Sequence, residues 1–187
     1  MAPYTQYGKD GLPIEHHDLQ DKAVWCKDGA STEEVFVEMH GGLLGIQINP
    51  EKENDPYAPD LISTQNQILG DLKTQNTPFF KSESLYGIPP RYAVVFNLKD
   101  RRRYNEKYPN IEIFYWVDWV SIGFEMGSTR IDIEPLIGVW KIAMPSFNEL
   151  LDKSPVHSYQ QRRYDTKGNA KGSYVFDIRD ERFQKLA

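Results

Sequence analysis

The sequence predicts a mixed α/β protein with a central sheet. Short apolar runs of strand length alternate with two segments of helical pattern. The apolar runs are residues 43–48, 92–96 and 111–120, and the helical segments are residues 31–40 and 100–108. A chain of 187 residues is long enough to bury a core. We expect an N-terminal extension, residues 1–30, followed by one domain, residues 31–187.

Composition excludes several classes of protein. Apolar residues make up 40% of the chain and aromatic residues 13%, which excludes a mainly disordered chain. The net charge of −5 argues against coating nucleic acid by bulk charge, but not against an enzyme that grips phosphates locally. Cys26 is the single cysteine, so an internal disulfide is impossible. No signal peptide or membrane-spanning run is visible, and we expect a cytoplasmic protein with no membrane partner.

The first helix is expected over residues 31–40. Ser31 is a candidate N-cap and Glu34 falls at the third helical position, which makes a capping box. Gly41 and Gly42 are expected to end the helix. Glu34 and Glu38 are four residues apart and therefore share one face. Residues 43–48 are a candidate first strand.

Residues 60–75 are expected to form a β-hairpin. Residues 60–64 suit one strand, Gln65 and Asn66 the tip, and residues 67–75 the returning strand. In this register, facing residues have numbers that sum to 131, so Asp60 lies opposite Asp71 with the Cβ atoms about 5 Å apart. Two facing carboxylates repel each other. A divalent cation between them would turn that repulsion into attraction.

Alternation along the returning strand places Lys73 on the same face as Asp71 and turns Leu72 toward the core. Gln75 falls on the face of Lys73 as well. It is suited to contact a phosphate or to position a water molecule, and equally to be an ordinary exposed strand residue.

The pattern Pro59-Asp60, ten residues, then Asp71-Leu72-Lys73 resembles the PD-(D/E)xK nuclease superfamily. The resemblance implies a restriction-endonuclease-like α/β/α sandwich with a central mixed sheet of four to six strands. It covers residues 31–120, and residues 121–187 would add further strands and helices.

The same resemblance implies a metal-dependent DNA endonuclease that hydrolyses phosphodiester bonds with Mg²⁺ or Mn²⁺. Asp60, Asp71 and the Leu72 carbonyl would bind the metal, and Glu34 would complete the shell, with Glu38 as the second choice. Lys73 would hold or help deprotonate the attacking water and offset charge on the phosphate. Many nucleases that cut both strands are symmetric dimers, so a homodimer is also expected, although no residue indicates one.

Residues 99–107 form the densest basic segment, with Lys99, Arg101, Arg102, Arg103 and Lys107. A helix spreads consecutive arginines over different directions, so only some of Arg101, Arg102 and Arg103 would contact DNA phosphates. The alternative is a solvated or salt-bridged helix. Because this helix lies between the strands at 92–96 and 111–120, those two strands are expected to be parallel.

The remaining segments are interpreted from local signals alone. Residues 131–142 suggest one or two strands, residues 145–151 a helix with Ser146 as a cap, and residues 173–178 a closing strand. Arg162 and Arg163 are interleaved with Tyr159 and Tyr164, which suits either contacts to nucleic acid or an amphipathic surface segment.

A second hypothesis is a catalytically inactive nuclease-like fold that acts as a nucleic-acid-binding or inhibitory protein-interaction module. The acidic composition favours it, whereas intact Asp60, Asp71 and Lys73 argue against it. The sequence contains no Walker loop, Gly-x-Ser-x-Gly elbow, His-Glu-x-x-His motif or dinucleotide fingerprint. It does not indicate which DNA would be cut, or whether one strand or two.

Overall fold

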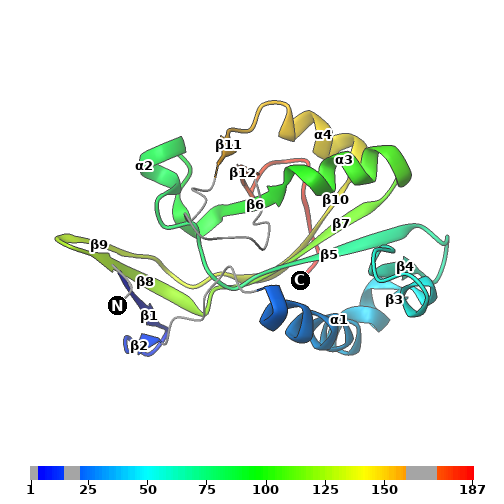
Figure 1. The fold of residues 1–187 in the computed structure, drawn as a ribbon, viewed down its shortest axis with the longest axis horizontal. Helices are drawn as coiled ribbons and strands as arrows, with labels where there is room; N and C mark the ends of the chain where they lie inside the picture. The colour runs from blue at the N-terminus through cyan, green and yellow to red at the C-terminus, as the bar shows by residue number, and fades with distance from the viewer. Residues whose placement is uncertain (1–3, 15–21, 159–171) are drawn as a thin grey trace.

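The computed structural model describes residues 4–14, 22–158 and 172–187, with the backbone alone for residues 22–31. The described chain is a mixed α/β protein with four α-helices and three sheets (Figure 1). The helices are α1 (Lys22–Leu44), α2 (Ser82–Tyr86), α3 (Leu98–Lys107) and α4 (Met144–Leu151). Two 3₁₀ turns, η1 (Pro50–Glu53) and η2 (Pro90–Tyr92), lie in the connections.

The largest sheet has six strands in the order β13-β10-β7-β5-β4-β3. β5 and β7 are parallel, and the other neighbours are antiparallel. The strands are β3 (Ile46–Ile48), β4 (Leu61–Ser63), β5 (Leu69–Gln75), β7 (Glu112–Asp118), β10 (Ile137–Ala143) and β13 (Gln184–Lys185).

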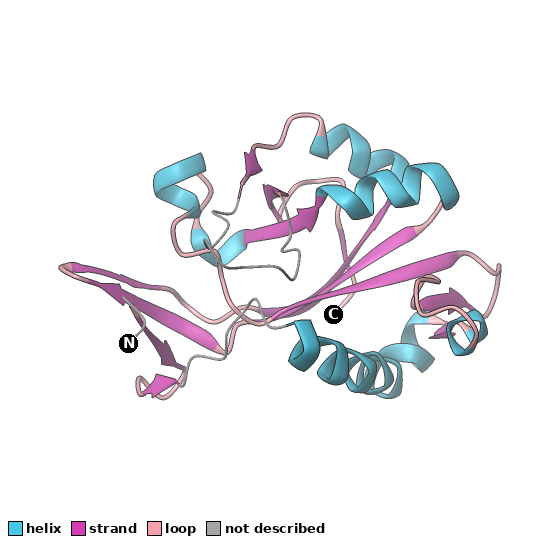
Figure 2. Ribbon diagram, in the orientation of Figure 1, coloured by secondary structure: helices cyan, strands magenta, loops and turns pink. Residues whose placement is uncertain are grey.

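Side-chain alternation along β7 divides the core into two parts. Phe114 belongs to the cluster under α1, together with Phe36 and Leu72. Its neighbours Ile113 and Tyr115 belong to the cluster under α3 and α4. α1 accordingly lies on one face of the sheet, and α3 and α4 lie on the other (Figure 2), because successive strand residues point to opposite sides.

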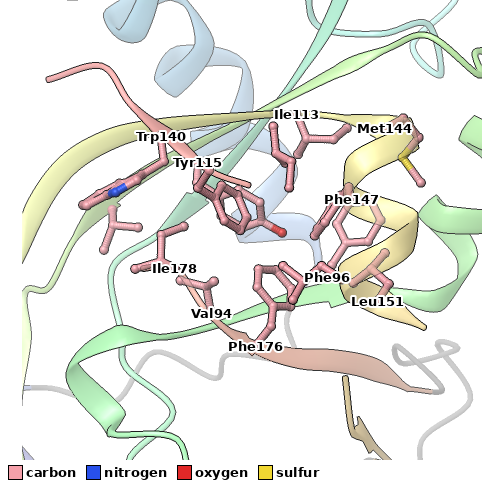
Figure 3. Close-up of a cluster of buried hydrophobic side chains, with 14 of the residues drawn as sticks. Val94, Phe96, Ile113, Tyr115, Trp140, Met144, Phe147, Leu151, Phe176 and Ile178 are labelled. Atoms are coloured by element: carbon pink, nitrogen blue, oxygen red, sulfur yellow. The ribbon is translucent and has the colours of Figure 1, made fainter. Parts of the chain in front are cut away.

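The cluster under α3 and α4 is rich in aromatic rings (Figure 3). Phe147 of α4 contacts Phe96 and Tyr115, with ring centroids 4.7 and 6.3 Å away. Phe176 and Phe183 extend this cluster toward the end of the chain. These contacts fasten α4 and the C-terminal segment onto the sheet beside β5.

Two smaller sheets complete the fold. One has the order β2-β1-β8-β9 and projects from one end of the body (Figure 1); its strands are β1 (Thr5–Gly8), β2 (Pro13–Ile14), β8 (Ser121–Met126) and β9 (Thr129–Asp132). The other has the order β11-β12-β6, with β6 (Ala93–Asn97), β11 (Val156–His157) and β12 (Ser173–Asp177). Among the described residues, no helix is long and apolar enough to cross a membrane.

The hairpin prediction was correct in register and wrong at the tip. Leu61 pairs with Gly70 and Ile62 with Leu69, so facing numbers sum to 131. The turn is longer than two residues, since the Ser63 amide donates to the Ile68 carbonyl and the strands resume at Leu69. The residue with positive φ is Gln67, at 60°.

Three predictions about other elements were wrong. α1 begins at Lys22 and passes through Gly41 and Gly42 to Leu44, so Ser31 lies inside the helix and does not cap it. Gly41 lies where an added Cβ would meet the Ile46 carbonyl at 2.8 Å, and Gly45, with φ of 64°, follows the last helical residue.

The expected parallel pairing of residues 92–96 with residues 111–120 is also wrong, because β7 is parallel to β5 while β6 pairs with β12. Finally, α4 starts after Ala143, and Ser146 does not cap it. The prediction for Tyr159, Arg162, Arg163 and Tyr164 lies outside the described residues.

Candidate functional site

The fold brings Asp60, which directly precedes β4, close to Asp71 of β5. The Leu72 amide donates to Oδ2 of Asp60 at 2.9 Å, so the Asp60 carboxylate lies against the backbone of β5. Asn49 positions the segment that leads into β4. Its backbone N–H donates to the Asp60 carbonyl at 2.9 Å, and its side-chain amide donates to the Pro59 carbonyl at 3.0 Å. Hydrogen bonds from Asn49 and from the Leu72 amide therefore hold Pro59 and Asp60 in place.

Asp71 and Lys73 lie on one face of β5, as predicted, with Leu72 on the other face in the cluster under α1. The side chain of Asp71 is only 5% exposed, and its Oδ2 lies 2.8 Å from Nζ of Lys73. The predicted trio is therefore joined through Asp71, because Lys73 contacts Asp71 directly and the charge of Asp60 raises the pKa of Asp71.

Lys73 has a second set of partners on β6 and α3. Its Nζ lies 2.8 Å from Oδ2 of Asp100 and donates to the hydroxyl of Tyr104 at 3.5 Å. The rings of Phe96 and Tyr104 lie 5.7 and 5.6 Å from the ammonium group, within cation–π range. Two carboxylates, one phenol and two aromatic faces therefore surround Lys73.

A second ammonium group, that of Lys52 in η1, contacts the other aspartate. Nζ of Lys52 donates to Oδ1 of Asp60 and to both carboxylate oxygens of Glu33, at 2.7 and 2.8 Å. Lys52 therefore links the helix α1 to the hairpin through two acids. All three side chains are about four-fifths buried.

Burial dominates the electrostatics of the site. It raises the pKa of Asp60, and the charge of Glu33 raises it further against the opposing pull of Lys52. Burial likewise raises the pKa of Asp71, with Lys73 opposing. For Lys73, burial lowers the pKa, but Asp71, Tyr104 and Asp100 outweigh it and raise that pKa well above the usual range. The shift of the Lys73 pKa favours its charged form, whereas the shifts of the Asp60 and Asp71 pKa values favour their neutral forms.

The helix acid near the site is Glu33 rather than Glu34. Glu34 and Glu38 are exposed, and among the contacts of the described residues none joins either of them to Asp60 or Lys73. Successive residues of an α-helix point about 100° apart, so a one-residue error moves the carboxylate to another face.

The side chain of Gln75 links β5 to β6. Its side-chain amide donates to the Val95 carbonyl of β6 at 3.0 Å, and the side chain is half-buried. It is the last residue of β5 and lies on the face of Asp71 and Lys73, as predicted, but its amide nitrogen donates to the backbone of a neighbouring sheet.

The three arginines of α3 have different surroundings. Arg101 donates to Asn148 and to the Tyr174 hydroxyl, which ties α3 to α4 and β12. Arg103 lies over the ring of Tyr104, with Nη2 3.5 Å from Asp100 and 3.9 Å from Asp71. Arg102 is exposed. Of the three, Arg103 is the one that belongs to the site.

The residues present provide a two-carboxylate donor set for a metal ion. Within the described ranges, no group of three or more His, Cys, Asp and Glu side chains is arranged to hold a metal. Mg²⁺, however, is commonly held by one or two carboxylates, with water and substrate phosphates filling the other positions. Oδ2 of Asp71 is buried and makes no hydrogen bond of acceptable geometry, although it lies close to Lys73. This buried oxygen and the adjacent Asp60 fit that mode of binding.

Sequence reasoning missed four members of the site: Glu33, Lys52, Asp100 and Tyr104. Lys52 lies in a polar loop with no periodic pattern, so no signal distinguished it. Asp100 and Tyr104 are four apart on a predicted helix and so share a face, a spacing from which they could have been found.

Comparison of the chain with protein-family models, curated proteins and solved structures gives no match.

Proposed function

We propose that this protein is a metal-dependent DNA endonuclease of the PD-(D/E)xK type. The observation that carries the proposal is the proximity of Asp60, Asp71 and Lys73. Asp60 accepts a hydrogen bond from the Leu72 amide, its charge raises the pKa of Asp71, and Nζ of Lys73 lies 2.8 Å from Asp71. The arrangement of the elements agrees with the expected α/β/α sandwich. α1 and the strands β3, β4 and β5 precede β7, which is parallel to β5, and helices cover both faces of the sheet (Figure 2).

The donors proposed for the metal are the carboxylates of Asp60 and Asp71 and the carbonyl of Leu72. Glu33 replaces Glu34 as the candidate helix acid, acting through water or after Lys52 moves. Mg²⁺ or Mn²⁺ bound there would neutralise charge on a phosphate and make a bound water more acidic. Burial raises the pKa of both aspartates and the neighbouring lysines lower it, so a divalent ion bound beside them would act in the same direction as the lysines and favour the ionised carboxylates.

Lys73 supplies the remaining positive charge in this proposal. Asp71 and Asp100 hold its ammonium group beside the aspartates. From this position it can donate a hydrogen bond to a water molecule or to a phosphate oxygen and offset negative charge as it develops. A group held as a cation is suited to this electrostatic role.

Incubating purified protein with supercoiled and with branched DNA in Mg²⁺ or Mn²⁺ tests the proposal. Removing a metal ligand or the adjacent cation abolishes charge stabilisation that acts in the transition state, so we expect Asp71→Asn and Lys73→Met each to reduce cleavage by at least about 100-fold. Lys141→Met is the matched control, because Lys141 forms a comparably buried ion pair with Glu112 on strands β10 and β7. Equal cleavage by wild type and both site variants would contradict the proposal.

One observation favours the second hypothesis, an inactive binding module. Asp60 contacts Lys52, and Asp71 contacts Lys73, so the chain itself provides a cation for each aspartate. A binding module predicts DNA or protein binding without cleavage, and a melting temperature that Mg²⁺ does not change. An endonuclease predicts that Mg²⁺ raises the melting temperature of the wild type and not that of Asp60→Ala.

A further inference from the structure

Lys73 is held between carboxylates that come from two different elements. Asp71 is two residues away on the same strand, so their pairing is a local consequence of alternation along β5. Asp100 is 27 residues away on α3, and its Oδ2 lies as close to Nζ as that of Asp71, at 2.8 Å. Asp71 alone would balance the charge of Lys73, and Arg103 faces the other oxygen of Asp100. The contact between Asp100 and Lys73 therefore concerns where the ammonium group is held and not only how its charge is balanced.

The position of Asp100 is fixed by the residues around it. Oδ1 faces the Arg103 guanidinium at 3.5 Å, while Oδ2 faces Lys73. One helical turn further on, Tyr104 is fully buried against the sheet and brings its hydroxyl to the same ammonium group. The contact between Asp100 and Lys73 is therefore built into the packing of α3 and does not depend on a freely rotating surface side chain.

A divalent cation at Asp71 would disturb the local pair. The Asp71 carboxylate would become a metal ligand, and the metal would repel the neighbouring ammonium group, since like charges a few ångströms apart in a buried site interact strongly. With Asp71 as its only partner, Lys73 would either block the metal or leave the site. A carboxylate on the far side of Lys73 removes this conflict.

We propose that Asp100 is a positioning residue that holds the Lys73 ammonium group beside the site when Asp71 takes up a divalent cation. This inference rests on the proposed function. Asp100 acts through Lys73 and touches neither the metal nor the DNA. Its removal leaves Lys73 paired with Asp71, in competition with the metal.

The test compares the wild-type chain with Asp100→Asn, which keeps the size of the side chain and removes its charge. Mg²⁺ is titrated while the melting temperature is followed, and DNA cleavage is measured over a range of substrate concentrations. Outer-shell partners of metal sites typically contribute 10- to 100-fold, so we expect the Mg²⁺ midpoint to rise and kcat to fall by about that factor, with KM for DNA unchanged. Asp100→Glu should restore most of both.

Asp152→Asn is the control. It removes a carboxylate at the end of α4 that pairs with Arg101 of α3, and this pair does not involve Lys73. If Asp100→Asn fails to fold by circular dichroism, Asp100→Ser provides the same comparison. A wild-type Mg²⁺ midpoint and kcat in the variant would overturn the inference, even if its metal-free melting temperature were lower. If the wild type itself neither binds Mg²⁺ nor cleaves DNA, the proposed function fails and this inference fails with it.

Discussion

Two lysines pair with the two aspartates of the motif, and they have different surroundings. Lys73 is enclosed by β5, β6 and α3, with a carboxylate on each of two elements. Lys52 lies in η1, and its three contacts all go to Glu33 and Asp60. Among the described residues, Glu33 is the only other acid that contacts Lys52, and Glu33 is itself a candidate metal ligand. Lys52 is therefore expected to compete with the metal.

Lys52→Met is predicted to strengthen metal binding. The substitution keeps the length of the side chain and removes the ammonium group, which leaves the charges of Glu33 and Asp60 to attract a divalent ion. We expect the Mg²⁺ concentration at half-maximal thermal shift to fall about tenfold. The metal-free variant should melt at a lower temperature, because two acids lose their shared cation.

The matched substitution is Lys141→Met, which breaks a single lysine–glutamate pair elsewhere on the large sheet. It should leave the Mg²⁺ midpoint unchanged. A weaker response of Lys52→Met to Mg²⁺ than that of the wild type would show that Lys52 supports the site and does not compete for it.

The residues of the site that lie in the hairpin could be predicted from the sequence, whereas those contributed by other elements were missed. Asp60, Asp71 and Lys73 could be placed together because strand alternation and hairpin register are local rules. Glu33 could not be chosen over Glu34, since the helical phase depends on how α1 packs through Phe36, which is fully buried. No local rule fixes that orientation.

Among the elements, α3 contributes residues to the site and also contains most of the densest basic segment. Its inner face contributes Asp100 and Tyr104, and Arg101 is occupied by α4 and β12. Arg102 is exposed and, within the described part of the chain, forms no ion pair or hydrogen bond through its side chain. If α3 contacts DNA, Arg102 is the arginine free to do so.

Arg102→Gln is predicted to weaken DNA binding by about tenfold at low salt and to reduce the salt dependence of binding by about one phosphate contact. Fluorescence anisotropy with labelled DNA over a range of salt concentrations, in Ca²⁺ or without metal, measures both quantities. Arg130→Gln, on the projecting sheet, is the control for loss of one exposed arginine. An unchanged salt slope for Arg102→Gln would mean that this face of α3 does not contact the phosphates.

The sequence predicted where several elements lie better than it predicted which strands pair. β5, α3 and β7 lie close to where the sequence predicts them. The structure adds Asn97, which caps α3 by accepting from the Lys99 amide at 2.8 Å. The parallel pairing was assigned to the wrong strand, because the chain after β5 leaves the large sheet for α2 and β6 before returning as β7. Sheet membership depends on long-range pairing, which neighbouring residues do not encode.

For the whole molecule, the site lies on a central strand of the largest sheet. β5 is near the middle of the six-strand sheet, paired with β4 on one side and β7 on the other, and core clusters lie on both faces. Gly70 at its start allows close packing, since an added Cβ would lie 2.9 Å from the ring of Phe114. Rigid strands hold side chains more precisely than loops do, which suits a site that must place two carboxylates around one ion.

The account depends on a divalent ion binding between Asp60 and Asp71, and a crystal structure of the protein grown with Mn²⁺ measures this directly. Anomalous scattering should show one Mn²⁺ within about 2.2 Å of an oxygen of each carboxylate, with Lys52 displaced from Asp60 and Lys73 still on Asp100. Crystals that hold Mn²⁺ at saturating concentration elsewhere, or not at all, with Lys52 and Lys73 still paired to the two aspartates, would contradict it.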